Sequence, residues 1–341
     1  FQAEDGIRDL VRSRGLGDVY KRQIVENILK FTPIYKERVW GGRSIEKIYL
    51  RQLPKAELKY GESWEIVDRP NDQSTVVGGE YHGKTLNYLW NNYREDIFGQ
   101  GMPDTDRFPL MLKILDARQK LSLQVHPPKS ICHILDSEPK TELWYIAHAE
   151  PGSVIYYGLK NGMSKDEFRD SINEGNLHDK IKPFPVKCGD FIFLPSGCLH
   201  AIGEGIVIFE IQQNSDTTYR VYDWGRMGID GKPRTLHKDE ALMCIDFEDN
   251  EPLMGNRNNG QLVRCPYFNV DILSLRSGDK KKLEKDSRFS IYCLVDGSLG
   301  IYDQIIKAGD SFILPASETN TPIEFPCDSE SKIIRITMPD Q

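Results

Sequence analysis

The sequence has no long apolar run, no paired cysteine motif and no excess of positive charge. No apolar stretch approaches the roughly 20 residues that a membrane helix needs, and no signal-peptide pattern stands near the start. The net charge is −7, whereas a surface that binds nucleic acid is usually basic. None of the seven cysteines belongs to a Cys-x-x-Cys pair, which is typical of free thiols in a reducing compartment. We therefore expect a cytoplasmic protein with no membrane and no nucleic-acid partner.

What the sequence does contain is a series of short segments that alternate between apolar and polar residues. Hydrophobic residues make up 39% of the 341 residues, enough for a sizeable core. Alternation at period two predicts strands, so the fold class that we predict is dominated by β-structure. Helical spacing is confined to residues 85–98, to a small insert at about 164–181 that opens on a capping box, and to residues 236–245. Residues 130–138 are expected to be a plain connection.

Two of these strands carry side chains that suit a metal ion. Gln124 and His126 lie two residues apart, so both face the same side of their strand. Glu142 opens a second strand with Lys140 on the same face, and His200 follows a tight Pro-x-Gly turn. Two imidazoles, a carboxylate and an amide oxygen are typical ligands of a borderline divalent ion, Zn²⁺ first. We predict one such ion per chain, and with one charged ligand it stays a Lewis acid.

The spacing of these residues resembles two known patterns. The turn before His200 is similar to the second metal motif of cupin barrels, and the Gln-x-His and Lys-x-Glu pairs resemble the short bacterial form of type I phosphomannose isomerases. The resemblance spans roughly residue 24 to the C-terminus. It implies two cupin-type β-barrels (jelly rolls) and a zinc-dependent isomerase that interconverts mannose 6-phosphate and fructose 6-phosphate through a cis-enediol. The matching motifs are Ser122-x-Gln124-x-His126-Pro127, Lys140-x-Glu142, Gly189-x₅-Pro195-x-Gly197-x₂-His200 and Asp216-x₃-Arg220.

A polar face follows the metal motifs along the chain. Asp216, Thr218, Arg220 and Tyr222 alternate, so we expect all four on one face as a wall for substrate. Asp216 is a candidate for ring opening, and Arg220 for stabilising the enediolate or gripping phosphate. A cation beside Lys140 would lower the pKa of the amine, which favours a neutral base. The predicted catalytic residues are therefore Lys140, Asp216 and Arg220.

Other residues are candidates for holding the sugar phosphate. The resemblance implies that Ser122 lines the pocket. Lys113 lies inside an apolar strand, where a lysine is costly unless it is paired or functional. Lys129 and Arg234 are further basic candidates for the phosphate. The expected partner is a small phosphorylated sugar, and the expected assembly is a monomer or a weak homodimer.

The chain also suggests a division into domains. Residues 1–23 resemble translated adapter sequence, and we expect them to be a non-native extension. The Asn- and Gly-rich residues 249–260 predict a boundary between a metal-binding domain, 24–250, and a second barrel, 256–341. Residues 309–315 repeat residues 189–195, but Asn320 stands at the position of His200. The second barrel is therefore expected to hold no metal.

Two other functions remain open at this point. A metal-dependent cupin oxygenase usually presents a His-rich ligand set, whereas Gln124 replaces one histidine here. A non-catalytic sugar-binding cupin would hold the sugar without turnover. Oxygen uptake would identify the first, and a coupled assay with mannose 6-phosphate would identify the second.

Overall fold

The fold is built almost entirely from strands, as the period-two segments predicted. The structure is a computed structural model, and it describes residues 28–160, 162–248, 251–278, 280–283, 287–302, 304–316, 323–326 and 330–340. The predicted extension 1–23 and Asn320 lie outside the described residues.

The helices are short and lie between the strands. They are α1 (Ser44–Tyr49), α2 (Leu86–Asn92), the π-helical turn η1 (Arg94–Phe98), α3 (Lys129–Leu135), α4 (Lys165–Glu174), the 3₁₀ turn η2 (Leu177–Lys180) and α5 (Lys238–Cys244). The strands are β1 (Leu29–Phe31), β2 (Ile34–Gly42), β3 (Tyr60–Ile66), β4 (Val76–Val77), β5 (Leu110–Ala117), β6 (Leu123–Val125), β7 (Glu142–Ala149), β8 (Val154–Leu159), β9 (Ile181–Pro185), β10 (Asp190–Leu194), β11 (His200–Ile202), β12 (Ile206–Gln213), β13 (Tyr219–Tyr222), β14 (Leu253–Asn256), β15 (Gly260–Arg264), β16 (Asn269–Leu275), β17 (Lys280–Leu283), β18 (Ser290–Asp296), β19 (Ser298–Ile301), β20 (Gln304–Lys307), β21 (Ser311–Leu314), β22 (Ile323–Pro326) and β23 (Ser331–Thr337).

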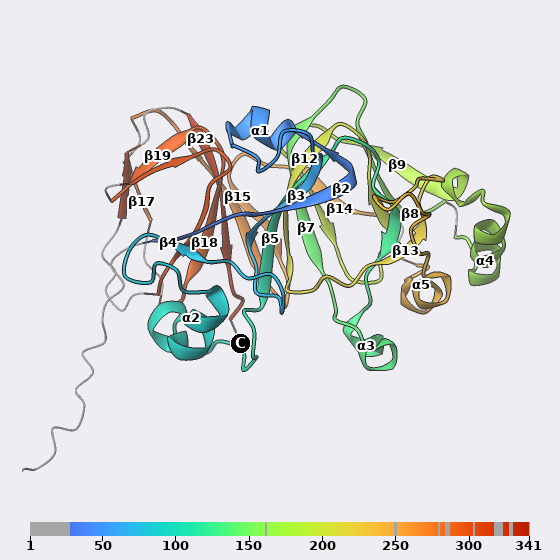
Figure 1. Ribbon diagram of the computed structural model, residues 1–341, viewed down its shortest axis with the longest axis horizontal. Helices are drawn as coiled ribbons and strands as arrows, with labels where there is room; N and C mark the ends of the chain where they lie inside the picture. Colours follow the sequence, from blue (N-terminus) through green and yellow to red (C-terminus); the bar gives the residue numbers. More distant parts are fainter. Residues whose placement is uncertain are drawn as a thin grey trace, which may run out of the picture.

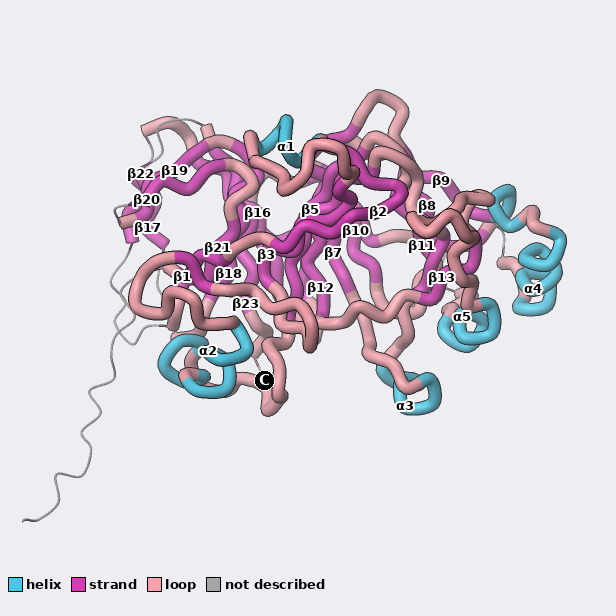
Figure 2. The backbone as a smooth tube through the Cα atoms, in the orientation of Figure 1, coloured by secondary structure: helices cyan, strands magenta, loops and turns pink. Residues whose placement is uncertain are grey.

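The strands form layers that follow one another along the long axis of the molecule (Figure 1). A five-stranded sheet, β13-β6-β11-β8-β9, lies at one end and faces a seven-stranded sheet, β14-β10-β7-β12-β5-β3-β2. A second seven-stranded sheet, β15-β16-β23-β18-β21-β1-β4, follows, and the two-stranded sheets β17-β22 and β19-β20 lie beyond it (Figure 2). The described strands form open sheets. A jelly roll also divides its strands between two sheets, but the two closed barrels are not confirmed.

Two apolar cores hold these layers together. Between the five-stranded sheet and its neighbour, Tyr157 and Ile202 pack with Trp144 and Ile208. A larger cluster joins the two seven-stranded sheets and contains strand residues of both. Burial of each such side chain contributes roughly 1.5–3 kcal/mol. The charged site described below lies at the first of these interfaces, next to this apolar packing.

The start of the described chain belongs to the C-terminal sheet. Leu29 of β1 pairs with Ile313 of β21, and Phe31 pairs with Val76 of β4. Conversely, β14 follows residue 250 in the chain but belongs to the first seven-stranded sheet, where it pairs with β10. The two halves therefore exchange strands, and the boundary at 249–260 stays a prediction.

The helical predictions had mixed outcomes. Ser164 accepts a hydrogen bond from the backbone of Glu167, whose carboxylate accepts from the backbone of Ser164, so the predicted capping box is confirmed. The predicted helix 85–98 is divided into α2 and η1. The prediction that residues 130–138 form a connection without helix is wrong. The helix α3 begins at Lys129, directly after two prolines. No helix among the described residues is long and apolar enough to cross a bilayer.

Candidate metal centre and active site

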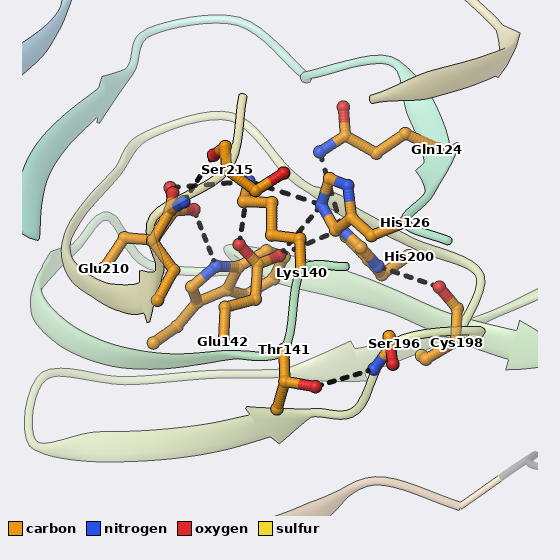
Figure 3. A network of polar contacts seen from close by, with 12 residues as sticks. Gln124, His126, Lys140, Thr141, Glu142, Ser196, Cys198, His200, Glu210 and Ser215 are labelled. Carbon is orange, nitrogen blue, oxygen red and sulfur yellow. Dashed lines mark hydrogen bonds and ion pairs between the residues drawn. The ribbon is translucent and has the colours of Figure 1, made fainter. Parts of the chain in front are cut away.

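Three buried side chains from separate strands meet between the first two sheets. His126 directly follows β6, Glu142 begins β7 and His200 begins β11. One ligand atom from each lies within 4.8 Å of the others, and all three side chains are buried (Figure 3). Antiparallel pairing of β6 with β11 sets His200 opposite Gln124, so the amide lies beside this group. The sheet pairing brings together residues that are up to 76 positions apart.

Backbone carbonyls orient both imidazoles. His126 Nδ1 lies 2.8 Å from the carbonyl oxygen of Thr217, and His200 Nδ1 lies 3.0 Å from that of Cys198. A carbonyl can only accept, so each ring carries its proton on Nδ1 and points an Nε2 lone pair into the site. Burial and the charge of Lys140 lower the pKa of His126 to about 3, which keeps this ring neutral.

The two Nε2 lone pairs converge on a carboxylate. Each Nε2 lies 3.2 Å from Glu142 Oε1, although neither oxygen of Glu142 accepts a well-aligned hydrogen bond. Three acceptors thus face one another, with Lys140 Nζ 3.4 Å from His126 Nε2 and the Gln124 amide nitrogen 3.4 Å from His200 Nε2 as neighbouring donors, and a single cation would satisfy all three acceptors at once. The donor set of this structure therefore fits a divalent ion.

Gln124 lies at the edge of this group. Its amide nitrogen is 3.4 Å from His200 Nε2, and its oxygen accepts a hydrogen bond from the Ser122 hydroxyl at 3.3 Å. Coordination through the oxygen requires a half-turn of the amide about its last torsion, which is a broad two-fold rotor. Its role as a ligand stays a prediction.

A chain of buried charges continues from Glu142. Lys140 Nζ lies 3.0 Å from Glu142 Oε2 and 3.8 Å from Glu210 Oε1, and Lys113 Nζ lies 3.4 Å from Glu210 Oε1. Burial by itself lowers the pKa of Lys140, but the carboxylates of Glu142 and Glu210 outweigh it and raise the pKa. The carboxylates of the protein therefore act against the lowered pKa that we expected, and the charge of a bound cation would act in the opposite direction, together with burial.

Glu210 is a site residue that the sequence reasoning missed. It is fully buried in β12, and its second oxygen accepts a hydrogen bond from Trp144 Nε1 at 3.0 Å. Burial and the charge of Glu142 raise the pKa of Glu210, while Lys140 and Lys113 lower it. The sequence did contain a signal for Glu210, because a single carboxylate stands inside an apolar strand. Burying that charge costs free energy, as it does for Lys113 in β5.

A cavity of about 530 Å³ opens above the charged chain. This volume is within the usual range for a small-molecule site. Lys140, Gln124 and Glu210 line it next to the metal group, and Arg38 lines it from β2, where Glu62 holds the guanidinium at 2.7 Å. The other predicted residues that line it are Ser122, Lys113, Asp216, Thr218, Arg220 and Arg234.

The predicted polar wall is only partly correct. Tyr222 is not among the cavity residues, because the register of β13 against β6 shifts between Arg220 and Tyr222 and turns the face. Tyr222 stacks instead on His178, with ring centroids 5.5 Å apart. Asp216 and Arg220, which share this predicted face, form no ion pair among the described residues: Arg220 donates to the Ser122 hydroxyl and to the Thr235 carbonyl, at 3.3 and 2.9 Å.

The comparisons with known proteins identify the family. Over 304 residues the chain is 37% identical to mannose-6-phosphate isomerase ManA of Bacillus subtilis, which covers 84% of this chain and 92% of that protein. The chain belongs to the type I phosphomannose isomerase family. Residues 28–138 match the model of the catalytic domain of type I phosphomannose isomerase. As a member of this family the protein is an isomerase, as the sequence predicted.

Solved structures agree with this assignment. The crystal structure of the mannose 6-phosphate isomerase from Bacillus subtilis matches with a TM-score of 0.79 and 32% identity, covering 92% of this chain and 100% of that chain. A mannose 6-phosphate isomerase bound with zinc and yttrium has the same fold, with a TM-score of 0.70 and 14% identity over 92% of this chain. The strand layers of Figure 1 are thus the architecture of the phosphomannose isomerase family.

One basic candidate lies outside the cavity of this phosphomannose isomerase. Lys129 is the exposed first residue of α3 and is not a cavity residue. We predict that Lys129→Ala leaves kcat/KM for mannose 6-phosphate within about twofold of the wild type, since surface substitutions away from a site have small effects. Steady-state kinetics check this. A large rise in KM would show that Lys129 contacts substrate.

Proposed function

We propose that this chain interconverts mannose 6-phosphate and fructose 6-phosphate with one Zn²⁺ ion. The ion would be held by His126, Glu142 and His200, with the amide oxygen of Gln124 as the fourth ligand. The main support is the convergence of two Nε2 lone pairs and a carboxylate oxygen. The relatives named above, which carry this activity in their names, and the zinc-bound structural neighbour support the same reading.

The donor atoms favour zinc among the common divalent ions. Two imidazoles suit zinc better than magnesium or calcium, which prefer oxygen ligands. Only one of the four proposed ligands is charged, so a bound ion keeps net positive charge. When bound, the ion supplies Lewis acidity that polarises the sugar's oxygens.

Lys140 is our candidate for the group that moves the proton. In aldose–ketose isomerisation a proton leaves C2 and returns to C1. Nζ of Lys140 lines the cavity beside Glu142, so it can take the proton from one carbon and return it to the other. Glu210 orients the amine from its other side, at 3.8 Å. Asp216, which also lines the cavity, is proposed to assist ring opening.

Arg220 links the residues beside the proposed metal ligands to the segment that precedes α5. Nε donates to Ser122, which in turn donates to Gln124, while Nη1 donates to Thr235. Arg234, which also lines the cavity, is held at Asp223, with Nε 2.7 Å from Oδ2. We propose that the sugar's reacting carbons lie next to Lys140 and that its phosphate lies near Arg234, because guanidinium groups match phosphate oxygens.

Metal removal tests the proposed function directly. We expect dialysis against a chelator to abolish mannose 6-phosphate isomerisation, and added Zn²⁺ to restore it. Metal analysis and a coupled assay on the same sample give the stoichiometry, expected to be one ion per chain. Full activity in metal-free protein would contradict the proposal. Oxygen uptake would instead identify an oxygenase, and sugar binding without turnover would identify a binding protein.

Some broader expectations belong to the same proposal. We infer a cytoplasmic monomer or weak homodimer in which residues 24–250 form a metal-binding cupin barrel and residues 256–341 a second barrel without metal. The described cysteines are all free, which is consistent with a reducing compartment. Light scattering on the purified protein measures the assembly state.

A further inference from the structure

His237 lines the cavity, and neither the metal group nor the proton-transfer residues account for it. It lies at the N-terminal end of α5 and is held against β13 by two hydrogen bonds to one residue. Its backbone N–H donates to the Arg220 carbonyl at 2.7 Å, and its ring Nδ1 lies 3.2 Å from the backbone nitrogen of Arg220. The edge of Tyr219 also packs against the ring, with centroids 5.8 Å apart. The ring is therefore fixed in position relative to Arg220.

These contacts determine the tautomer of His237. A backbone N–H can only donate, so Nδ1 must be an unprotonated acceptor and the ring proton must lie on Nε2. Burial and the charge of Arg220 lower the pKa of His237, while Glu240 raises it, so the ring is neutral at ordinary pH. Among the described residues, no protein acceptor is found for Nε2. His237 is thus a fixed, neutral N–H donor on the cavity wall.

The surroundings of His237 favour an anion as the acceptor. Arg220 donates to a hydroxyl and a carbonyl, so its charge has no carboxylate in direct contact within the described chain. Arg234 and Arg226 share the single carboxylate of Asp223. Burial, and after it the charge of Arg234, lower the pKa of Arg220, while the carboxylate of Asp223 raises it. Asp216 and Asp230 also line the cavity, but among the described residues no carboxylate is in direct contact with Arg220 or with His237 Nε2.

We infer that His237 donates its Nε2–H to the phosphate of the substrate, together with Arg220 and Arg234, and so selects phosphorylated sugars. The inference rests on the proposed function, because it takes the substrate to be a sugar phosphate. A neutral N–H donates one hydrogen bond to a phosphate oxygen without adding charge beside the guanidinium groups of Arg220 and Arg234. A hydrogen bond to a charged acceptor is expected to change affinity about ten- to a hundredfold.

Two substitutions separate the two nitrogens of the ring. His237→Asn places an amide oxygen near Nδ1, where it can still accept from Arg220, but it removes the donor at Nε2. His237→Gln reaches further and places an amide N–H near Nε2. His178→Asn is the matched control, because His178 is exposed and stacks on Tyr222 outside the cavity.

The experiment measures mannose 6-phosphate kinetics and the affinity for inorganic phosphate, with the metal-loaded protein. We expect His237→Asn to raise KM and the phosphate Kd together by about tenfold or more, with kcat changed less than threefold. His237→Gln should stay within about threefold of the wild type, and His178→Asn should be unchanged. Thermal unfolding of each variant confirms the fold.

The outcomes distinguish this inference from the proposed function. A fall in kcat with KM and phosphate affinity unchanged would overturn it, as would equal losses in His237→Asn and His237→Gln. Wild-type protein that does not bind inorganic phosphate would overturn it too. If phosphate binds in a His237-dependent manner but mannose 6-phosphate is not converted, the proposed function fails and the phosphate subsite stands.

Discussion

Replacing Glu142 by alanine should remove both the metal and the activity. Glu142 is the only charged member of the proposed ligand set, and Oε1 is the atom on which both imidazoles converge. Without it, two neutral rings and an amide remain, beside the charge of Lys140, which repels a cation. The ion's Lewis acidity is worth several kcal/mol, so kcat/KM should fall by about a thousandfold or more.

Metal analysis and the coupled isomerase assay on one sample measure this prediction. Removing one partner of a buried charge pair also costs stability, about 3–5 kcal/mol, so Glu142→Gln, which keeps the volume, should accompany the alanine variant. Glu150→Ala is the matched control, because Glu150 follows the same strand but is exposed and pairs with Arg118. A folded Glu142→Gln protein with full metal and full turnover would contradict the site.

Replacing Lys140 by alanine should have the opposite effect on the metal. Lys140 Nζ lies 3.0 Å from Glu142 Oε2 and 3.4 Å from His126 Nε2, so its charge opposes a cation held by the same residues. Its removal should therefore leave metal content unchanged or increase it. Turnover should fall by about 10²–10⁴-fold, which is the usual contribution of a positioned general acid–base group.

The contrast between metal content and turnover makes this test specific. Lys129→Ala is the matched control, since it removes a lysine from the surface and not from the cavity. Full turnover in Lys140→Ala would remove this lysine from the mechanism. Loss of metal together with turnover would instead indicate that Lys140 supports the ligand geometry.

The Gln-x-His and Lys-x-Glu motifs, with the Pro-x-Gly turn before His200, could be recognised from the sequence. The two-residue repeat of a strand is a local property, so it predicted that each pair shares a face. His126, Glu142 and His200 were therefore predicted as a group, and the structure brings them within reach of one ion. Most strands, and the capping box of α4, were also local and were found where expected.

The errors concern contacts that local patterns do not specify. Tyr222 was placed on the cavity wall because its spacing is correct, but a register shift against β6 turns it away. Lys129 was considered for its charge, yet its helix carries it to the surface. Glu210 was not considered, because its partners Lys140 and Lys113 are 70 and 97 positions away along the chain and pair with it only through the sheet.

By itself, the sequence determined which ligand-type side chains share a strand face, because alternation depends only on neighbouring residues. Only the tertiary structure decided which ring nitrogen of His126 and of His237 faces the site. The carbonyl of Thr217, 91 positions along the chain, sets this for His126, and the backbone of Arg220, 17 positions away, sets it for His237, whereas the Cys198 carbonyl that orients His200 is only two residues away. Hydrogen bonds between distant segments form only after the sheets have paired, so no local pattern encodes them.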